Sequence, residues 1–137
     1  MASRWARWRA LPARERRQTL LAAALIPLAA ASLRIAGVRR TLKPLARGPA
    51  GLDPRAAREA ARAVARAARH APYRGNCLSQ SIALTWLLRR RGVAADLRFG
   101  ARRREGQLEA HAWVEHDGVV LNDTPDVARR FSPFGSS

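Results

Sequence analysis

The spacing of apolar residues changes once along the chain, near Gly92, and this change restricts the fold more than any other feature. Before it, apolar residues recur every three or four positions, which is the period of a helix. After it, they alternate with polar residues, which is the pattern of strands with one buried face. Helices followed by consecutive strands predict an α+β fold, in which a central helix packs on a small antiparallel sheet.

The alternating region predicts three strands joined by polar turns. Apolar residues alternate from 93 to 99 and from 108 to 114, and a short apolar run follows at 119–121. Polar turns are predicted at 102–106 and 116–118, so that consecutive strands pair as an antiparallel meander. The face of the middle strand opposite its apolar side carries Glu109, His111, Trp113 and Glu115.

Two helices are predicted before these strands. The first begins at Pro54, with Asp53 as its N-cap, and ends near His70; its alanine-rich stripe packs closely but buries little area. The second, Cys77–Arg91, ends before Gly92 and is apolar around most of its circumference, so we expect it to be the central, buried helix. The first helix also carries a second stripe, which consists of Arg55, Arg58, Arg62, Arg66 and Arg69. We expect this stripe to face solvent; a specific anion site is the alternative.

Residues 1–50 are predicted to form a basic and apolar helical segment, and residues 51–137 the folded domain, with a Pro- and Gly-rich break at 44–53. The uncharged stretch Gln18–Leu33 follows a run of arginines and has the outline of a secretory signal. It is shorter than the roughly 20 residues that span a bilayer, Pro27 interrupts it, and basic residues continue after it. We therefore expect a cytoplasmic protein whose apolar helix contacts its own domain, a partner or a membrane surface; export is the alternative.

Positive charge is concentrated in the first half of the chain. There are 26 Lys and Arg residues against 10 Asp and Glu, a net charge of +16. Residues 1–76 carry +14 of this charge and residues 77–137 only +2. We expect the first half to meet an anionic surface, which is an acidic peptide, a partner protein or a lipid headgroup. Every basic residue except Lys43 is arginine, a skew that coding bias explains, so no nucleic-acid partner is expected.

Cys77 is the one cysteine of the chain, which excludes an internal disulfide, and no paired Cys/His spacing indicates zinc. It begins the most apolar helix, where the helix dipole favours a thiolate and the Cys77 backbone N–H can receive an oxyanion. The alternative is an inert thiol, because lone cysteines mostly serve as small hydrophobic residues. His111 and His116 point to opposite strand faces and no phosphate-binding loop is present, so neither a metal nor a nucleotide cofactor is expected.

His111 is a candidate for the base that a nucleophilic cysteine requires. It lies on the sheet that is predicted to pack against the Cys77 helix, so thiol and imidazole can meet across that contact. Hairpin pairing brings Asp123 beside it, where a carboxylate can fix the tautomer of the imidazole. Asn122 is the nearest competitor for this third role, and a purely structural role for all of these residues remains the other interpretation.

Four ordered blocks of sequence lie within residues 71–134: CLSQSIAL at 77–84, LLRRRG at 87–92, HAWVE at 111–115 and LND at 121–123. Together they resemble the transglutaminase-like cysteine peptidases of lasso-peptide biosynthesis. The HAWVE block occurs across the wider transglutaminase-like superfamily, whereas the LLRRRG block is narrower. The resemblance implies a papain/transglutaminase-like core preceded by N-terminal helices.

The resemblance also implies an activity, that of a leader peptidase: a cysteine protease that cuts a ribosomally made precursor between leader and core. Carried over residue by residue, Cys77 would be the nucleophile, His111 the base and then the acid, and Asp123 the orienting carboxylate; Gln80 receives no role. A separate leader-binding partner protein and an ATP-dependent lasso cyclase are implied as partners, and no cofactor. The alternatives are an acyl-transferring transglutaminase-like enzyme and a non-catalytic scaffold subunit at a membrane surface.

Overall fold

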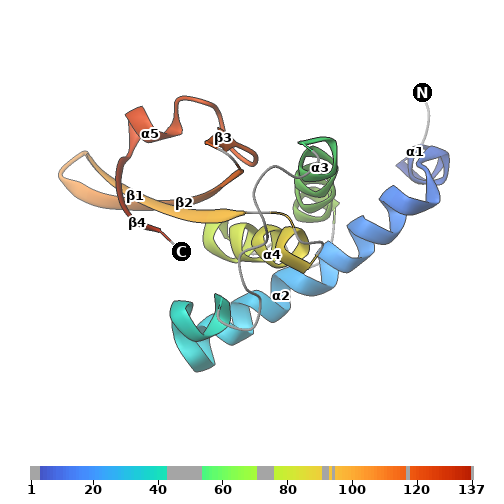
Figure 1. Ribbon diagram of the computed structural model, residues 1–137, viewed down its shortest axis with the longest axis horizontal. Helices are drawn as coiled ribbons and strands as arrows, with labels where there is room; N and C mark the ends of the chain where they lie inside the picture. The colour runs from blue at the N-terminus through green and yellow to red at the C-terminus, as the bar shows by residue number, and fades with distance from the viewer. Residues whose placement is uncertain are drawn as a thin grey trace.

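The computed structural model of the protein describes residues 4–42, 54–70, 76–90, 93, 95–116 and 118–136. Within these ranges the long helices come first and the strands follow, with one short helix before the last strand, so the predicted α+β class is confirmed (Figure 1). The helices are α1 (Arg4–Ala10), α2 (Ala13–Leu42), α3 (Pro54–His70), α4 (Cys77–Arg90) and α5 (Val127–Arg130). The strands are β1 (Asp96–Arg104), β2 (Gln107–His116), β3 (Val119–Val120) and β4 (Ser132–Ser136). The predicted break at 44–53, the Asp53 cap and the helix end at Gly92 lie outside the described residues.

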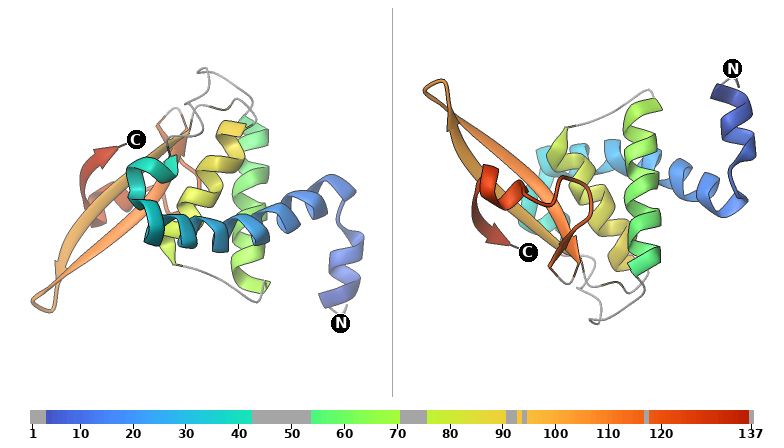
Figure 2. Two further views of the ribbon diagram at one scale, coloured as in Figure 1. Left: turned by 90° about the horizontal axis from the view of Figure 1, so that it is seen from below. Right: turned by 90° about the horizontal axis from the view of Figure 1, so that it is seen from above.

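Helix α4 is the central element, as predicted from its apolar circumference. It packs on α2 and α3 on one side and on β1 and β2 on the other, and the three views agree on this arrangement (Figures 1 and 2). Ile82, Leu84 and Leu88 of α4 are fully buried. Each such side chain contributes roughly 1.5–3 kcal/mol of burial free energy, which makes this helix the main source of the core.

Helix α3 contributes small side chains to the same core. Ala57 and Ala60 are fully buried and Val64 nearly so, which lets the helix backbones approach closely. The expectation that the whole arginine stripe faces solvent is wrong at Arg66, whose Nη1 donates a hydrogen bond to Thr19 Oγ1 of α2 at 2.9 Å. Thr19 is buried, and its hydroxyl also donates to the Glu15 carbonyl at 2.9 Å, so Arg66 satisfies its acceptor side.

Helix α2 passes through Pro27 without a break, contrary to the interruption expected there. The proline removes one backbone hydrogen bond, but Ala22, Ile26 and Ala29 are fully buried against α3 and α4 and hold the helix on both sides of it. The kink occurs instead at Gly37, whose φ of 80° glycine adopts without a steric penalty.

One face of α2 packs on the domain and another is exposed. The segment from Ala13 to Gly37 contains an 18-residue window with a mean hydropathy of 1.8 and is long and apolar enough to cross a membrane, by length and composition alone. Core helices and N-terminal signal sequences pass the same test, so this property does not assign the helix to a bilayer. The exposed face carries large apolar side chains, among them Leu20, Leu28 and Ile35.

The four strands form one antiparallel sheet in the order β3-β2-β1-β4. The hairpin between β1 and β2 is tighter than predicted, because β1 continues to Arg104 and only Glu105 and Gly106, both with positive φ, form the turn. The hairpin tip projects past the helices (Figure 2), and this leaves Leu108 73% exposed although the alternation predicted it to be buried.

Both faces of the sheet are covered, which the alternation did not predict. Leu97, Ala112 and Val114 face α4, as expected. The opposite face carries Trp113, which is fully buried against Val127 and Phe131 from the C-terminal segment that contains α5 and β4. The sheet therefore lies between α4 and α5 (Figure 1). The cluster of Trp113, Val127 and Phe131 lies on the His111 side of β2, because the His111 ring contacts the rings of Trp113 and Phe131.

Candidate active site

Cys77 is the first residue of α4, and a polar cap fixes this end of the helix. Asn76 Oδ1 accepts the N–H of Ser79 at 2.9 Å, and Ser79 Oγ accepts the N–H of Asn76 at 2.9 Å. The Ser79 N–H is therefore satisfied by the cap, and the Gln80 N–H donates to the Asn76 carbonyl in the first intrahelical hydrogen bond. The amides of Cys77 and Leu78 precede them in the first turn, beside a half-buried thiol. This is the place where an oxyanion can meet backbone N–H groups.

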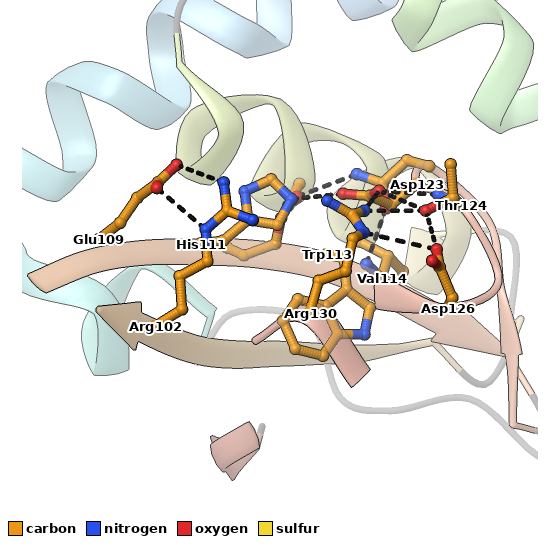
Figure 3. A network of polar contacts seen from close by, with 12 residues as sticks. Arg102, Glu109, His111, Trp113, Val114, Asp123, Thr124, Asp126 and Arg130 are labelled. Carbon is orange, nitrogen blue, oxygen red and sulfur yellow. Dashed lines mark hydrogen bonds and ion pairs between the residues drawn. The ribbon is translucent and has the colours of Figure 1, made fainter. Parts of the chain in front are cut away.

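His111 and Asp123 lie in direct contact (Figure 3). Nε2 of His111, on β2, pairs with Oδ2 of Asp123, in the segment after β3. The contact follows from hairpin pairing, because the Leu121 N–H donates to the Val114 carbonyl and carries the next residues back along β2. With Nε2 held by the carboxylate, Nδ1 is the ring nitrogen that can accept a proton from a thiol.

The second oxygen of Asp123 is held by Arg130 and Thr124. Oδ1 accepts hydrogen bonds from Arg130 Nη2 at 2.7 Å and from the Thr124 N–H at 2.7 Å. Partial burial raises the pKa of Asp123, but the hydrogen bonds from His111 and Thr124 and the charges of His111 and Arg130 outweigh it and leave the pKa below its ordinary value. The carboxylate is therefore ionised and fixed on both oxygens, so that it can orient the imidazole.

The imidazole of His111 is also held by aromatic rings. Phe131 stacks on it with ring centroids 4.8 Å apart, and Trp113 lies on the same strand face with centroids 6.1 Å apart. The Arg102 guanidinium lies over the other side of this cluster, 4.5 Å from the Phe131 centroid. Arg102 also pairs with Glu109, and this hydrogen bond holds the pKa of the Glu109 carboxyl below its ordinary value (Figure 3).

Asn122 does not take the third position beside His111; it joins three elements instead. Its Oδ1 accepts the Val114 N–H at 2.8 Å, and its Nδ2 donates to Ser81 Oγ of α4 at 3.0 Å. The Ser81 hydroxyl in turn donates to the Ala112 carbonyl at 3.2 Å. Ser81 follows Cys77 by one helical turn on the same helix face, so these bonds tie the cysteine helix to the residues adjoining His111 and Asp123.

Several residues of the site were not predicted from the sequence. The Asn76 cap has a local signature, an asparagine three positions before a serine at the start of an apolar run. Arg130 and Phe131 have none, because they belong to a short C-terminal stretch without apolar periodicity and reach the site only through the tertiary fold. Among the described residues, no group of three or more His, Cys, Asp or Glu side chains is arranged to hold a metal ion.

The sequence of the chain is similar to known proteins to different degrees. The microcin J25-processing protein McjB of Escherichia coli is 35% identical over 60 residues, a match that covers 44% of this chain and 28% of that protein, less than a third of its length. No solved structure matches the chain. A family model described as the transglutaminase-like superfamily matches residues 20–136, which is most of the chain, and the protein therefore belongs to the transglutaminase-like superfamily.

Proposed function

We propose that the protein is a cysteine peptidase that removes the leader from a ribosomally made lasso-peptide precursor. The observation that carries the proposal is the pairing of His111 of β2 with Asp123, together with a cysteine at the start of α4, the helix that packs on β2. Membership of the transglutaminase-like superfamily supports cysteine-based chemistry, and the partial similarity to a microcin-processing protein supports a peptide substrate. Thiol, imidazole and carboxylate are the three groups that acyl transfer through a cysteine requires.

The mechanism follows from the roles of these groups. Nδ1 of His111 accepts the thiol proton of Cys77, and the thiolate attacks the carbonyl carbon of the last leader residue. The oxyanion that forms is received by the Cys77 N–H at the start of α4. His111 then returns its proton to the departing amine of the core, and Asp123 stabilises the imidazolium while it exists. Water, activated by His111, hydrolyses the thioester and releases the leader acid.

The proposal includes partners and a location. A separate leader-binding protein presents the precursor, and an ATP-dependent cyclase consumes the exposed core amine. We place the protein in the cytoplasm, with the exposed face of α2 against the membrane surface. That face carries Leu20 and Leu28 between Arg17 and Arg34, and Ile35 directly after Arg34. An apolar stripe with arginines at both ends suits an interface that offers acyl chains and anionic headgroups.

The test is incubation of the purified chain with the precursor encoded beside its gene and the leader-binding protein, followed by mass measurement of the products. We expect hydrolysis at the leader–core junction with the unaltered chain, and none with Cys77→Ala or His111→Ala. His70→Ala, at the end of α3, is the matched histidine control and keeps full activity. Cleavage by the Cys77→Ala chain would exclude the proposal.

The product mass also separates this proposal from its alternatives. A peptidase yields a leader that ends in a free carboxylate, whereas an acyl-transferring enzyme yields a leader joined to an amine. A scaffold subunit leaves the precursor uncut in the purified system, and its Cys77→Ala variant supports product formation in cells as well as the unaltered chain does. Each of these outcomes is read directly from the same mass spectra and from a parallel measurement in producing cells.

A further inference from the structure

A cavity of about 410 Å³ lies beside the candidate active site, between α3 and the segment after β3. Asn122, which forms part of its wall, directly precedes Asp123 in the chain. Gln80, another part of the wall, lies three positions after Cys77 on α4, and residues at this spacing are neighbours on a helix surface. The cavity therefore adjoins both the cysteine helix and the segment that holds the catalytic carboxylate.

The charge of the cavity comes from α3. Arg58 and Arg62 are the charged residues in its lining, and they lie one helical turn apart on the same face. Arg62 reaches Glu15 only at 4.0 Å and its side chain is 56% exposed, so that ion pair is weak. Arg58 is exposed and makes no ion pair with any residue in the described part of the chain. Both guanidinium groups can therefore bind an anion.

Besides the two arginines and the amides of Gln80 and Asn122, the wall is apolar and its side chains are small. Ala61 and Val64 of α3 and Leu121 after β3 line the cavity with the two arginines. A short apolar stem that ends in a carboxylate matches this combination, because the stem contacts the apolar wall while its two oxygens accept from guanidinium N–H groups. The volume suits one or two side chains of a peptide, since ligand sites begin at about 300 Å³.

We infer that this cavity binds an acidic side chain of the precursor close to the scissile bond, with Arg58 and Arg62 as its cationic partners. The inference rests on the proposed peptidase function and names the substrate class more closely: a peptide with Asp or Glu near the cleavage site. The arginine stripe of α3 is then divided by role. Arg66 joins α3 to α2, whereas Arg58 and Arg62 face the substrate.

The test compares enzyme and substrate variants in the cleavage assay. The Arg58→Gln/Arg62→Gln double variant is expected to raise KM about tenfold or more, with kcat changed less than twofold, because two charge-assisted hydrogen bonds are lost in binding. Changing each acidic residue near the cleavage site to its amide should identify one that causes the same rise. When this altered precursor is cleaved by the double variant, KM should rise no further than with either change alone. Arg69→Gln, on the same helix but outside this cavity, is the matched control.

Binding is measured separately from cleavage. A fluorescently labelled precursor is titrated with the Cys77→Ala chain, and again with that chain carrying the two arginine substitutions, in the presence of the leader-binding protein. Weaker binding in the second titration supports the inference, whether or not cleavage is detected. A lack of cleavage by the unaltered chain would count against the peptidase function and not against the cavity as a binding site. Equal affinities, an unchanged KM, or an equal effect of Arg69→Gln would overturn the inference and leave the peptidase function standing. Thermal unfolding of each variant verifies that it is folded.

Discussion

Asn122 Nδ2 donates a hydrogen bond to Ser81 Oγ at 3.0 Å, and this contact joins the helix that begins at Cys77 to the segment that ends at Asp123. The same amide accepts the Val114 N–H, and the Ser81 hydroxyl donates to the Ala112 carbonyl. Ser81 and Asn122 therefore link the helix of Cys77, the proposed nucleophile, to the residues that adjoin His111, its proposed base, and neither has a proposed catalytic role. Replacing Ser81 or Asn122 should therefore change the relative positions of Cys77 and His111 while both side chains remain present.

Asn122→Ala is expected to lower kcat with little change in KM, because thiol and imidazole lose their relative placement while the substrate cavity keeps its arginines. The unpaired Val114 N–H costs about 1–3 kcal/mol of the free energy of unfolding. Steady-state kinetics and thermal unfolding measure the two effects. Ser132→Ala, at an exposed serine of β4, serves as the control. A kcat equal to that of the unaltered chain would show that this contact does not position the nucleophile.

Asp123→Asn should reduce kcat by about 100-fold or more while the chain stays folded, because an amide neither fixes the tautomer nor stabilises the imidazolium. Single-turnover cleavage, with circular dichroism to verify folding, measures this. An unchanged rate would assign the third role to another residue, and Asn122, the neighbouring side chain, would be tested first.

The stability of the protein should also depend on pH through Asp123. Because the folded-state pKa of this carboxyl is lowered, its ionised form stabilises the fold above its unfolded value of about 4, and this contribution is lost as pH falls through the lower folded value. The melting temperature of the unaltered chain should therefore exceed that of Asp123→Asn at pH 6–7, and the difference should shrink below pH 4. A difference that stays constant down to pH 3 would contradict this account.

Gly100→Ala is expected to destabilise the protein by about 1–3 kcal/mol and to reduce activity. A Cβ at this position would lie 2.8 Å from Phe131 Cβ and 2.9 Å from the Trp113 ring, on the strand position that pairs with His111. Chemical denaturation measures the loss. The Trp113→Phe background removes the ring atoms of the closest Trp113 contact, so the same substitution should cost less there. Equal costs in both backgrounds would exclude the Trp113 contact as the cause and leave the contact with Phe131 Cβ.

The proposed membrane contact of α2 predicts binding to anionic vesicles. Replacing Leu20, Leu28 and Ile35 with serine should abolish co-sedimentation with phosphatidylglycerol vesicles, and raised salt should weaken the binding of the unaltered chain. Phosphatidylcholine vesicles should bind it less. Leu108→Ser, at an exposed leucine of the hairpin tip, is the control for general loss of apolar surface. Undiminished co-sedimentation of the triple variant would assign the exposed face to another contact.

The order and type of the main elements could be predicted from the sequence because they depend on local periodicity. The helix that begins at Cys77 and the alternation through His111 both appear as local patterns, and a two-strand hairpin then brings Asp123 to His111. The element ends were less well predicted. The polar composition of residues 102–106 predicted a turn that includes the end of β1. In the structure Glu105 and Gly106 suffice for the turn, because both have positive φ.

The sequence by itself thus determined the α+β class, the central helix and the pairing of His111 with Asp123, since each depends on residues close together in the chain. Only the tertiary structure decided what surrounds them. The C-terminal segment carries Arg130 and Phe131 onto the outer face of the sheet, and α3 brings Arg58 and Arg62 to the cavity beside the site. These contacts join residues distant in sequence, and apolar periodicity shows which side of an element is buried but not which partner covers it.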